Sequence, residues 1–301
     1  MQHQVAHTPV LRDEVVQLLS PADRHILVDC TLGLGGHAEA LLDAAGPQAR
    51  LIGIDADEGN LRDAKARLET FGPRVRFFHA NFSDLADVLA AAGVVRVDAL
   101  LADLGTCSVQ LDDPRRGFSF AADGPLDMRM NTATGATAAK LVNTLEEERL
   151  AELIYSYGQE RYSRRIARAI CLARRHKPIE STVELANVVV AAYPRPALRA
   201  RRGVHPATRT FQALRIAVND ELASLERLLD ALPNVLAKGG RAAVVSFHSL
   251  EDRRVKQAFA AWTKAGAARL LTRKPVTPGE AEIERNPRSR SAKLRGLEKL
   301  D

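Results

Sequence analysis

The chain has 301 residues, of which 46% are hydrophobic and 27% charged, a balance that indicates a globular protein of about two domains and excludes collagen-like, disordered and disulfide-scaffold classes. Its net charge of +6 is uneven: residues 1–110 have nine basic and fifteen acidic side chains, residues 111–215 eighteen and eleven, and residues 216–301 sixteen and eleven. Positive charge confined to the last two thirds of the chain favours an anionic partner bound on one side, with nucleic acid the leading candidate.

Short apolar runs alternate with helix-like spacing through the first third of the chain, which is the pattern of βαβ units and a parallel sheet. Helices are expected over residues 58–70 and 83–92, the second with Ser83 as a plausible N-cap. The predicted strands span residues 25–30, 50–56, 75–80 and 97–104.

After Leu104 the alternation stops, and about a hundred residues follow with helical spacing and no convincing strand. A long helix is then expected over residues 206–232, before a buried strand at 239–247. The tail segments 268–273 and 291–300 suit an antiparallel edge pair. We therefore predict an α/β, Rossmann-like sheet with an all-helical domain inserted after the fourth strand, closing over the carboxyl ends of the strands. The predicted domains are residues 1–111 with 206–301, and the insertion 112–205.

Other features of the sequence point to the cytosol. The cysteines Cys30, Cys107 and Cys171 are odd in number and show no C-x-x-C spacing, so neither a disulfide framework nor a zinc ribbon is predicted. No apolar run reaches the roughly 18 residues of a membrane span, and the first residues lack the pattern of a secretory signal. We expect a complete cytoplasmic protein that does not bind membranes, and the sequence leaves a homo-oligomer open.

A glycine-rich loop lies between the first predicted strand and the first helix, in the sequence Gly33-Leu34-Gly35-Gly36-His37. Such a loop turns tightly and lets a ligand approach backbone N–H groups, although a purely structural turn explains it as well. Asp55, 20 residues after Gly35 at the end of the second predicted strand, is placed to accept hydrogen bonds from ribose hydroxyls. These features suit NAD and S-adenosylmethionine alike.

Residues after the third and fourth predicted strands favour S-adenosylmethionine. Phe82 suits an adenine, and Asp103 suits a cationic methionine group, whereas a second carboxylate would repel the pyrophosphate of NAD. Alone, Phe82 is equally explained as core packing and Asp103 as a cap. Together, at the ends of successive strands, they predict a methyltransferase.

Long motifs now resemble a known family. They occur in order from His7 to Ser291, and the chain is similar to the bacterial small-subunit ribosomal RNA cytosine-N(4) methyltransferases, the RsmH (MraW) family. The motifs are His7-Thr8-Pro9-Val10-Leu11, residues 29–37, Asp103-Leu104-Gly105, residues 110–113, residues 116–120, residues 124–130, residues 205–215, residues 246–253 and residues 286–291.

The resemblance implies a class I methyltransferase that uses S-adenosylmethionine to methylate a cytidine of 16S rRNA, in the decoding region of the small ribosomal subunit. One stretch departs from the family's usual Asp-Leu-Gly-Val-Ser-Ser-Pro-Gln: this chain has Val109 where the family has proline, which predicts a more mobile loop. The implied cofactor contacts are Gly35, Gly36, His37, Asp55, Phe82, Asp103 and Gln110.

Methylation of an exocyclic amine needs a near-attack geometry and an acceptor for the amine protons. We predict Asp103 as that acceptor, although the same carboxylate is also explained by cofactor binding alone. A base that leaves its stack needs an aromatic or apolar surface flanked by cations, and phosphates need compact cationic clusters. The candidate RNA-binding residues are Arg116, Phe118, Arg201, Arg202, Arg209, Arg215 and His248.

Four alternatives compete with this interpretation. Ser246, His248 and Asp252 suggest a hydrolase, but no G-x-S-x-G elbow is present, and Ser249-Leu250-Glu251-Asp252 predicts a capping box that starts a helix. The histidines show no clustered metal-ligand spacing, so no metal is expected. An RNA-binding assembly factor without turnover and an NAD-dependent dehydrogenase remain as rival functions.

Overall fold

The structure is a computed structural model that describes residues 9–200 and 203–300. The chain divides into two compact units, one formed by residues up to Gly105 together with those from Leu222 onward, and the other by Thr106–Glu221. The second unit includes more of the sequence than the insertion expected at 112–205. The reason is that α11 (Thr208–Asn219) packs against α7 (Glu147–Gly158) and contributes Phe211 and Leu214 to the same core.

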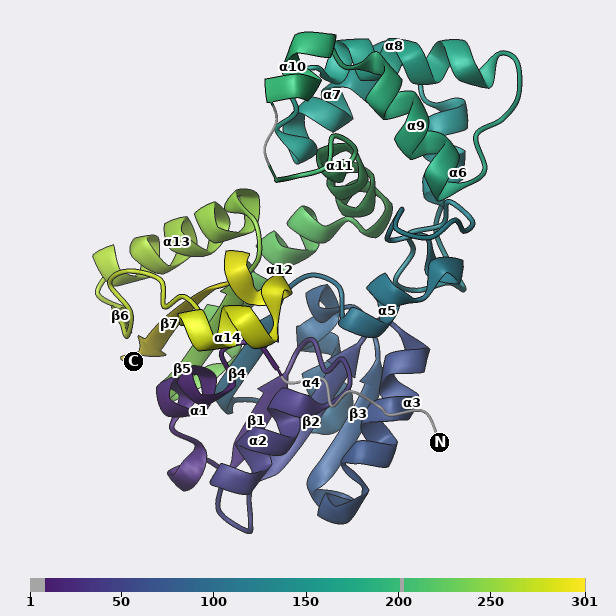
Figure 1. Cartoon of the computed structure of the whole chain (residues 1–301). Helices are drawn as coiled ribbons and strands as arrows, with labels where there is room; N and C mark the ends of the chain where they lie inside the picture. Colours follow the sequence, from purple (N-terminus) through teal and green to yellow (C-terminus); the bar gives the residue numbers. More distant parts are fainter. Residues whose placement is uncertain (1–8, 201–202, 301) are drawn as a thin grey trace. The chain divides into compact units, whose positions relative to one another are not determined.

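A seven-stranded sheet of order β3-β2-β1-β4-β5-β7-β6 forms the centre of the first unit (Figure 1). The first five strands in this order are parallel, and β7 and β6 add an antiparallel edge. The predicted mixed α/β fold and the antiparallel edge pair are confirmed. The strands are β1 (Ile26–Asp29), β2 (Arg50–Asp55), β3 (Val75–His79), β4 (Val97–Asp103), β5 (Leu236–Ser246), β6 (Ala268–Leu270) and β7 (Lys293–Lys299).

Successive side chains of the central strands bury themselves on opposite faces of the sheet, as the period of two in a strand requires. Leu100 and Ala102 of β4 pack with α4, α12 and α13, whereas Leu101 packs on the other face with α1, α2 and α3. Both faces are covered, which explains the nearly continuous apolar sequence of these strands. The helices of this unit are α1 (Arg12–Leu19), α2 (Gly36–Ala44), α3 (Glu58–Arg67), α4 (Leu85–Ala92), α12 (Glu221–Val235), α13 (Ser249–Lys264) and α14 (Glu280–Arg285).

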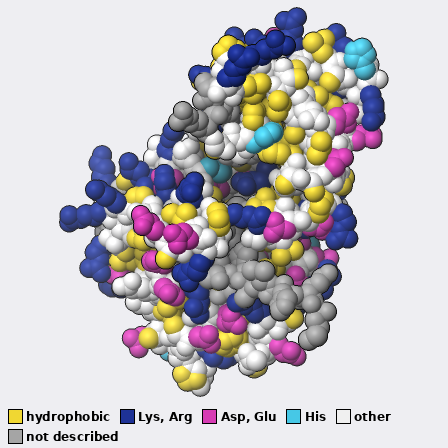
Figure 2. Space-filling view, in the orientation of Figure 1, with side chains coloured by type: hydrophobic (Ala, Val, Ile, Leu, Met, Phe, Trp, Pro, Cys, Tyr) yellow, Lys and Arg dark blue, Asp and Glu magenta, His cyan; other side chains and the backbone are white. Residues whose placement is uncertain are grey.

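The second unit is built from helices around a core of its own, and its chain segment lies between β4 and α12 in the sequence. Buried aliphatic side chains such as Ile154, Ile166 and Val189 fill this core. Lys and Arg side chains gather over the edge of the unit where α8 and α10 lie (Figure 2). Besides α7 and α11, its helices are α5 (Ser108–Asp112), α6 (Ala138–Thr144), α8 (Ser163–Arg174), α9 (Thr182–Ala192) and α10 (Arg195–Ala200).

The prediction of a single long helix over 206–232 is wrong, because the structure has two helices there, α11 and α12. Between them, Asp220 adopts a left-handed conformation with φ 49° and ψ 38°, which ends α11. Aspartate tolerates this conformation better than most residues because its short polar side chain bonds locally. Helical periodicity continued across the break, so the sequence pattern concealed it. Within the described residues, no helix combines the length and the apolar character needed to cross a membrane.

Candidate active site

Three carboxylates lie at one edge of the sheet because Asp29, Asp55 and Asp103 end β1, β2 and β4, which are neighbouring strands. The carboxyl ends of parallel strands form the edge where open α/β sheets bind their ligands. Only Asp55 and Asp103 were predicted from the sequence. The concentration of acids at this edge makes it the candidate active site.

The glycine-rich loop between β1 and α2 lies beside these acids. Gly33 and Gly35 have φ values of +53° and +78°, a region that glycine enters without steric cost. A Cβ built on Gly33 meets only the Thr31 carbonyl oxygen, at 3.8 Å, so the loop is open at Gly33, whereas a Cβ on Gly35 would lie 3.2 Å from Cδ1 of Leu68. Gly36 is different: a Cβ there would lie 2.5 Å from Cγ of Pro9, so the N-terminal segment packs directly on the start of α2.

Asp55 holds the backbone of two loops. Its Oδ2 accepts a hydrogen bond from the Gly33 N–H at 2.7 Å, and its Oδ1 accepts one from the Asp57 N–H at 2.7 Å. Nδ2 of Asn60 lies 3.3 to 3.4 Å from both oxygens. Burial raises the pKa of Asp55, and these donors oppose that rise. These contacts use both lone pairs of each oxygen, so the predicted contact with a ribose requires a hydroxyl to replace or share the long bonds from Asn60.

Asp103 is oriented by residues that follow β1. Its backbone N–H donates to Oγ1 of Thr31 at 2.6 Å, and its Oδ2 lies 3.4 Å from Nε2 of His37, the second residue of α2. The side chain of Asp103 is 22% exposed, while that of His37 is only 7% exposed. Asp103 therefore faces both the interior of the site and solvent, as a residue that touches a cofactor and a substrate must.

Asp29 is the residue that sequence reasoning missed. It is buried, and burial together with repulsion from Asp103 and Asp55 raises its pKa to about 7, although His37 and the Thr31 N–H oppose this rise. Its position in the sequence could have identified it. An acid at the last residue of an apolar strand costs free energy to bury unless a partner compensates its charge.

Several buried polar atoms of this cluster have no hydrogen-bond partner among the described residues: Oδ2 of Asp29, Oδ1 of Asp103 and both ring nitrogens of His37. Buried polar groups in folded proteins are nearly always paired, so unpaired acceptors beside an open glycine loop indicate a ligand site. Two partly desolvated carboxylates favour a ligand with positive charge. S-adenosylmethionine fits this requirement through its sulfonium and ammonium groups.

The other predicted cofactor residues lie in different places. Phe82 begins a short 3₁₀ turn after β3, is partly buried and packs on the core face that α4 covers. Gln110 belongs to the second unit, where it is 4% exposed and its Oε1 accepts a hydrogen bond from the Cys107 N–H at 3.1 Å. Val109 is the second residue of α5, where an N–H has no acceptor within the helix, so the N–H that valine adds relative to proline needs no intrahelical partner.

The N-terminal segment is held on the site by a residue from the far end of the chain. Leu11 is fully buried in a left-handed conformation, with φ 54° and ψ 37°, and its N–H donates to Oε1 of Glu282 at 2.8 Å. Glu282 lies on α14, so the tail of the chain fixes the segment that packs against Gly36. No feature of the sequence predicts this contact.

Three of the predicted RNA-binding side chains interact within the second unit, either in its core or through hydrogen bonds. Phe118 is 7% exposed and belongs to the core of that unit, so its ring is not presented for stacking on a base. The Arg116 guanidinium donates to the carbonyl oxygens of Arg129 and Met130. The Arg215 guanidinium forms a two-pronged pair with Glu221, at 2.8 and 2.9 Å.

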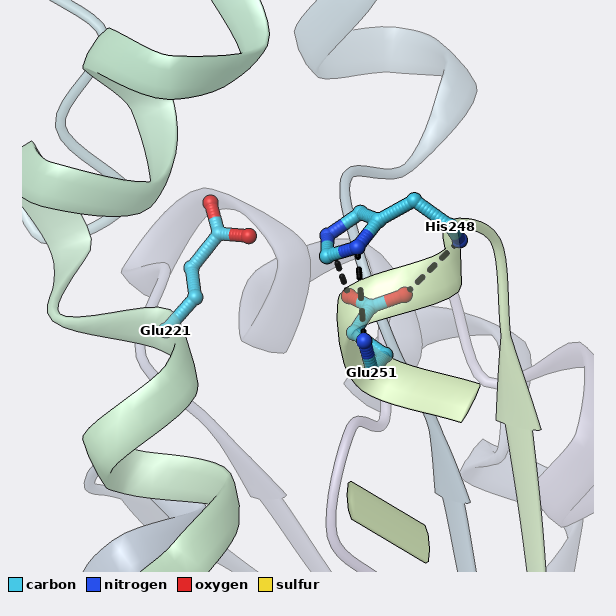
Figure 3. Close-up of side chains that lie close together, drawn as sticks. All are labelled: Glu221, His248 and Glu251. Atoms are coloured by element: carbon cyan, nitrogen blue, oxygen red, sulfur yellow. Dashed lines mark hydrogen bonds and ion pairs between the residues drawn. The ribbon is translucent and has the colours of Figure 1, made fainter. Parts of the chain in front are cut away.

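The remaining predicted RNA-binding residues lie in different environments or outside the described residues. Arg209 is 49% exposed and stays a candidate, while Arg201 and Arg202 lie outside the described residues. His248 is the N-cap of α13: its Nδ1 accepts from the Glu251 N–H, and Oε2 of Glu251 accepts from the N–H of His248 (Figure 3). The capping box predicted to begin at Ser249 therefore begins one residue earlier, and His248 has a structural role in starting the helix.

The sequence of this chain is similar to those of several known proteins. The MraW methylase family matches residues 4–300. Proteins named ribosomal RNA small subunit methyltransferase H, from Geobacter sp. (strain M21) and Sorangium cellulosum, are 50% and 52% identical to this chain over 98% of its length and 98% and 91% of theirs. A solved rRNA methylase from Streptococcus thermophilus has a TM-score of 0.44 and 11% identity, over 96% of this chain and 94% of that one.

Proposed function

Since this chain belongs to the MraW methylase family and is therefore an S-adenosylmethionine-dependent methyltransferase, we propose that it methylates the exocyclic N(4) amine of a cytidine in the decoding region of 16S rRNA. The observation that carries the proposal is the acidic cluster at the carboxyl ends of β1, β2 and β4, beside an open glycine loop. The names of the relatives support ribosomal RNA of the small subunit as the substrate. Such a substrate implies a cytoplasmic protein.

S-adenosylmethionine supplies a methyl group on a sulfonium, which is a reactive donor, whereas the amine of cytosine is a weak nucleophile because its lone pair is delocalised into the ring. The residues of the chain therefore have to position the base and manage a proton. Positioning alone accounts for much of the barrier in reactions of this kind when the reacting atoms are held about 3 to 3.5 Å apart.

We assign the cofactor to the residues around the glycine loop. Asp55 binds the ribose hydroxyls, Phe82 packs against the adenine, and Asp29 with Asp103 balances the positive charge of the methionine part. The left-handed Gly33 and Gly35 keep the loop flat enough for close approach. The assignment also includes two further residues from the family motifs, Gly36 and His37.

Asp103 is our candidate acceptor for the amine proton. Its side chain is 22% exposed, and its Oδ1 is buried with no hydrogen-bond partner among the described residues, so this oxygen has a free acceptor position. A carboxylate that accepts one amine N–H orients the nitrogen lone pair, and it takes up the proton that the nitrogen releases as the new N–C bond forms. Nε2 of His37 lies 3.4 Å from Oδ2 of this carboxylate and helps to orient it.

The test is nucleoside mass spectrometry of small ribosomal subunits, lacking this modification, after incubation with the protein and isotope-labelled S-adenosylmethionine. We expect label in N(4)-methylcytidine at a single position of 16S rRNA. Label in another nucleoside contradicts the proposed substrate atom. No label from a protein that still binds S-adenosylhomocysteine by calorimetry contradicts the enzymatic function and favours the assembly-factor alternative.

A further inference from the structure

Four exposed arginines lie along one side of α8 and its C-terminal cap: Arg164, Arg165, Arg168 and Arg175, here called the arginine face. Arg164, Arg168 and Arg175 follow one another at intervals of four and seven residues, which return to nearly the same side of an α-helix. Opposite them, Ile166 and Ile170 are fully buried in the core of the second unit. Lys and Arg side chains are visible over this edge in Figure 2.

The arginine face has no acidic counterpart. No aspartate or glutamate occurs between Glu160 and Glu180 in the sequence. None of the four arginines forms an ion pair with a described residue, and only Arg165 has a described hydrogen bond, from its Nε to the Ala192 carbonyl oxygen at 3.1 Å. Other exposed arginines of the same unit differ: Arg115 pairs with Asp113, and Arg149 pairs with Glu152.

This charge is not explained by the stability of the helix. The first turn of α8 holds basic residues and no acidic one, although the positive end of the helix dipole favours acidic residues there. Arg164 and Arg168 are also like charges four residues apart, which repel each other on a helix surface. Charges that weaken a helix and have no partner in the fold indicate a ligand outside it.

We propose that the arginine face binds the phosphate backbone of ribosomal RNA, an inference that rests on the proposed function and adds the surface that holds the substrate outside the catalytic site. The guanidinium fork matches phosphate oxygens in pairs. From Arg164 to Arg175 the helix advances about 16 Å, at 1.5 Å per residue, which is the length of several phosphates along an RNA strand.

A membrane surface fits the arginine face less well than RNA does. Helices that lie on membranes expose an apolar side next to their basic one, and the apolar side of α8 is buried in the core. Leu172, 48% exposed, is the one large apolar side chain of α8 that is exposed among the described residues. We therefore commit to RNA and treat binding to anionic vesicles as an outcome that would contradict the proposal.

Two arginines of α10 extend the arginine face. Arg195 and Arg199 are exposed, and they follow Ala192, the residue whose carbonyl oxygen accepts the hydrogen bond from Arg165. This bond ties α8 to the end of α9, directly before α10 begins. The extended surface predicts that RNA contacts continue from α8 to α10, so Arg199→Ala is expected to weaken RNA binding in the same direction as changes on α8.

The experiment compares the double variant Arg164→Ala/Arg168→Ala with the control Lys140→Ala/Arg149→Ala, which removes two exposed positive charges from α6 and α7 of the same unit. Binding to protein-free 16S rRNA is titrated at several salt concentrations, and methyl transfer to small subunits is measured alongside. For the α8 variant we expect a severalfold higher KM for subunits, an unchanged kcat, and a slope of log K against log salt shallower by up to about 1.4 to 1.8.

The controls distinguish failure of the arginine-face proposal from failure of the proposed function. S-adenosylhomocysteine affinity and the thermal unfolding transition should match the wild type in both variants, which shows that both units are folded. If the wild type methylates rRNA but the α8 variant has the slope and KM of the control variant, the arginine face is not an RNA surface and the proposed function stands. Tighter binding to phosphatidylserine vesicles than to RNA also overturns the inference. A wild type that neither binds nor methylates rRNA overturns the proposed function itself.

Discussion

The first unit concentrates negative charge inside a site, whereas the second spreads positive charge over its surface. Asp29, Asp55 and Asp103 share one edge of the sheet, and burial raises the pKa of Asp29 and Asp55. Arg164 and Arg168 are exposed on the surface of α8. Buried charges interact strongly at short range, while exposed charges are screened by salt and act as a group.

The difference matches two ligands of opposite charge. A small cationic cofactor gains most from a few desolvated carboxylates, because low local polarity strengthens each contact. A polyanion gains from many weak contacts, each of which releases a counterion. Single substitutions should therefore have large effects in the first unit and small, salt-dependent effects on the arginine face.

The largest effect is expected for Asp103→Asn. The amide keeps the shape of the side chain but loses the ability to take a proton from the amine, so kcat should fall by roughly 10² to 10⁴. Single-turnover methyl transfer to small subunits measures this loss, and S-adenosylhomocysteine binding by calorimetry serves as the control. A kcat within a few-fold of the wild type would show that Asp103 serves only the cofactor.

A smaller effect is expected for Asp55→Ala. Loss of charge-assisted hydrogen bonds worth about 1.5 to 3 kcal/mol should weaken S-adenosylmethionine binding roughly tenfold or more. The variant also releases the N–H groups of Gly33 and Asp57, so chemical denaturation should show a lower free energy of unfolding. Asp63→Ala, which removes an exposed carboxylate from α3, is the matched control and should leave both quantities unchanged.

If folded Asp55→Ala binds the cofactor with unaltered affinity, Asp55 does not bind the ribose and another residue does. A loss of stability without a loss of affinity would mean that Asp55 only supports the two loops. The comparison between the units would then rest on Asp29 and Asp103 alone.

The third effect concerns stability and pH, through Asp29. Its pKa is about 7 in the folded chain against an ordinary 3.8, so between these values the native state holds a proton that the unfolded state has lost. The free energy of unfolding should therefore fall as the pH rises from about 4 to about 7, by up to about 1.4 kcal/mol per pH unit from this group. Without cofactor, Asp29→Asn should show a flatter profile by urea denaturation, and identical slopes in the two proteins would refute the shift.

Local patterns predicted the elements that carry the cofactor site. The apolar runs at 25–30, 50–56 and 97–104 correspond to β1, β2 and β4, because a strand covered on both faces is apolar along its whole length. The hypothesis for Asp55 followed from its spacing after Gly35, and Gly33 of the same glycine-rich loop donates a hydrogen bond to Asp55. Spacing failed where the exposure of a side chain decides its use: Phe118, predicted to stack on a base, is in the core.

The sequence by itself determined the family, the mixed sheet and the acids that follow two of its strands, since these depend on neighbours within a few residues. Only the tertiary structure decided that Asp29 is buried beside Asp103, that Glu282 holds Leu11 across 271 positions, and that Arg116 and Arg215 are occupied while the arginines of α8 are exposed. The physical reason is that solvation and pairing depend on which distant segments pack together, and both set the pKa of a carboxylate and the availability of a cation.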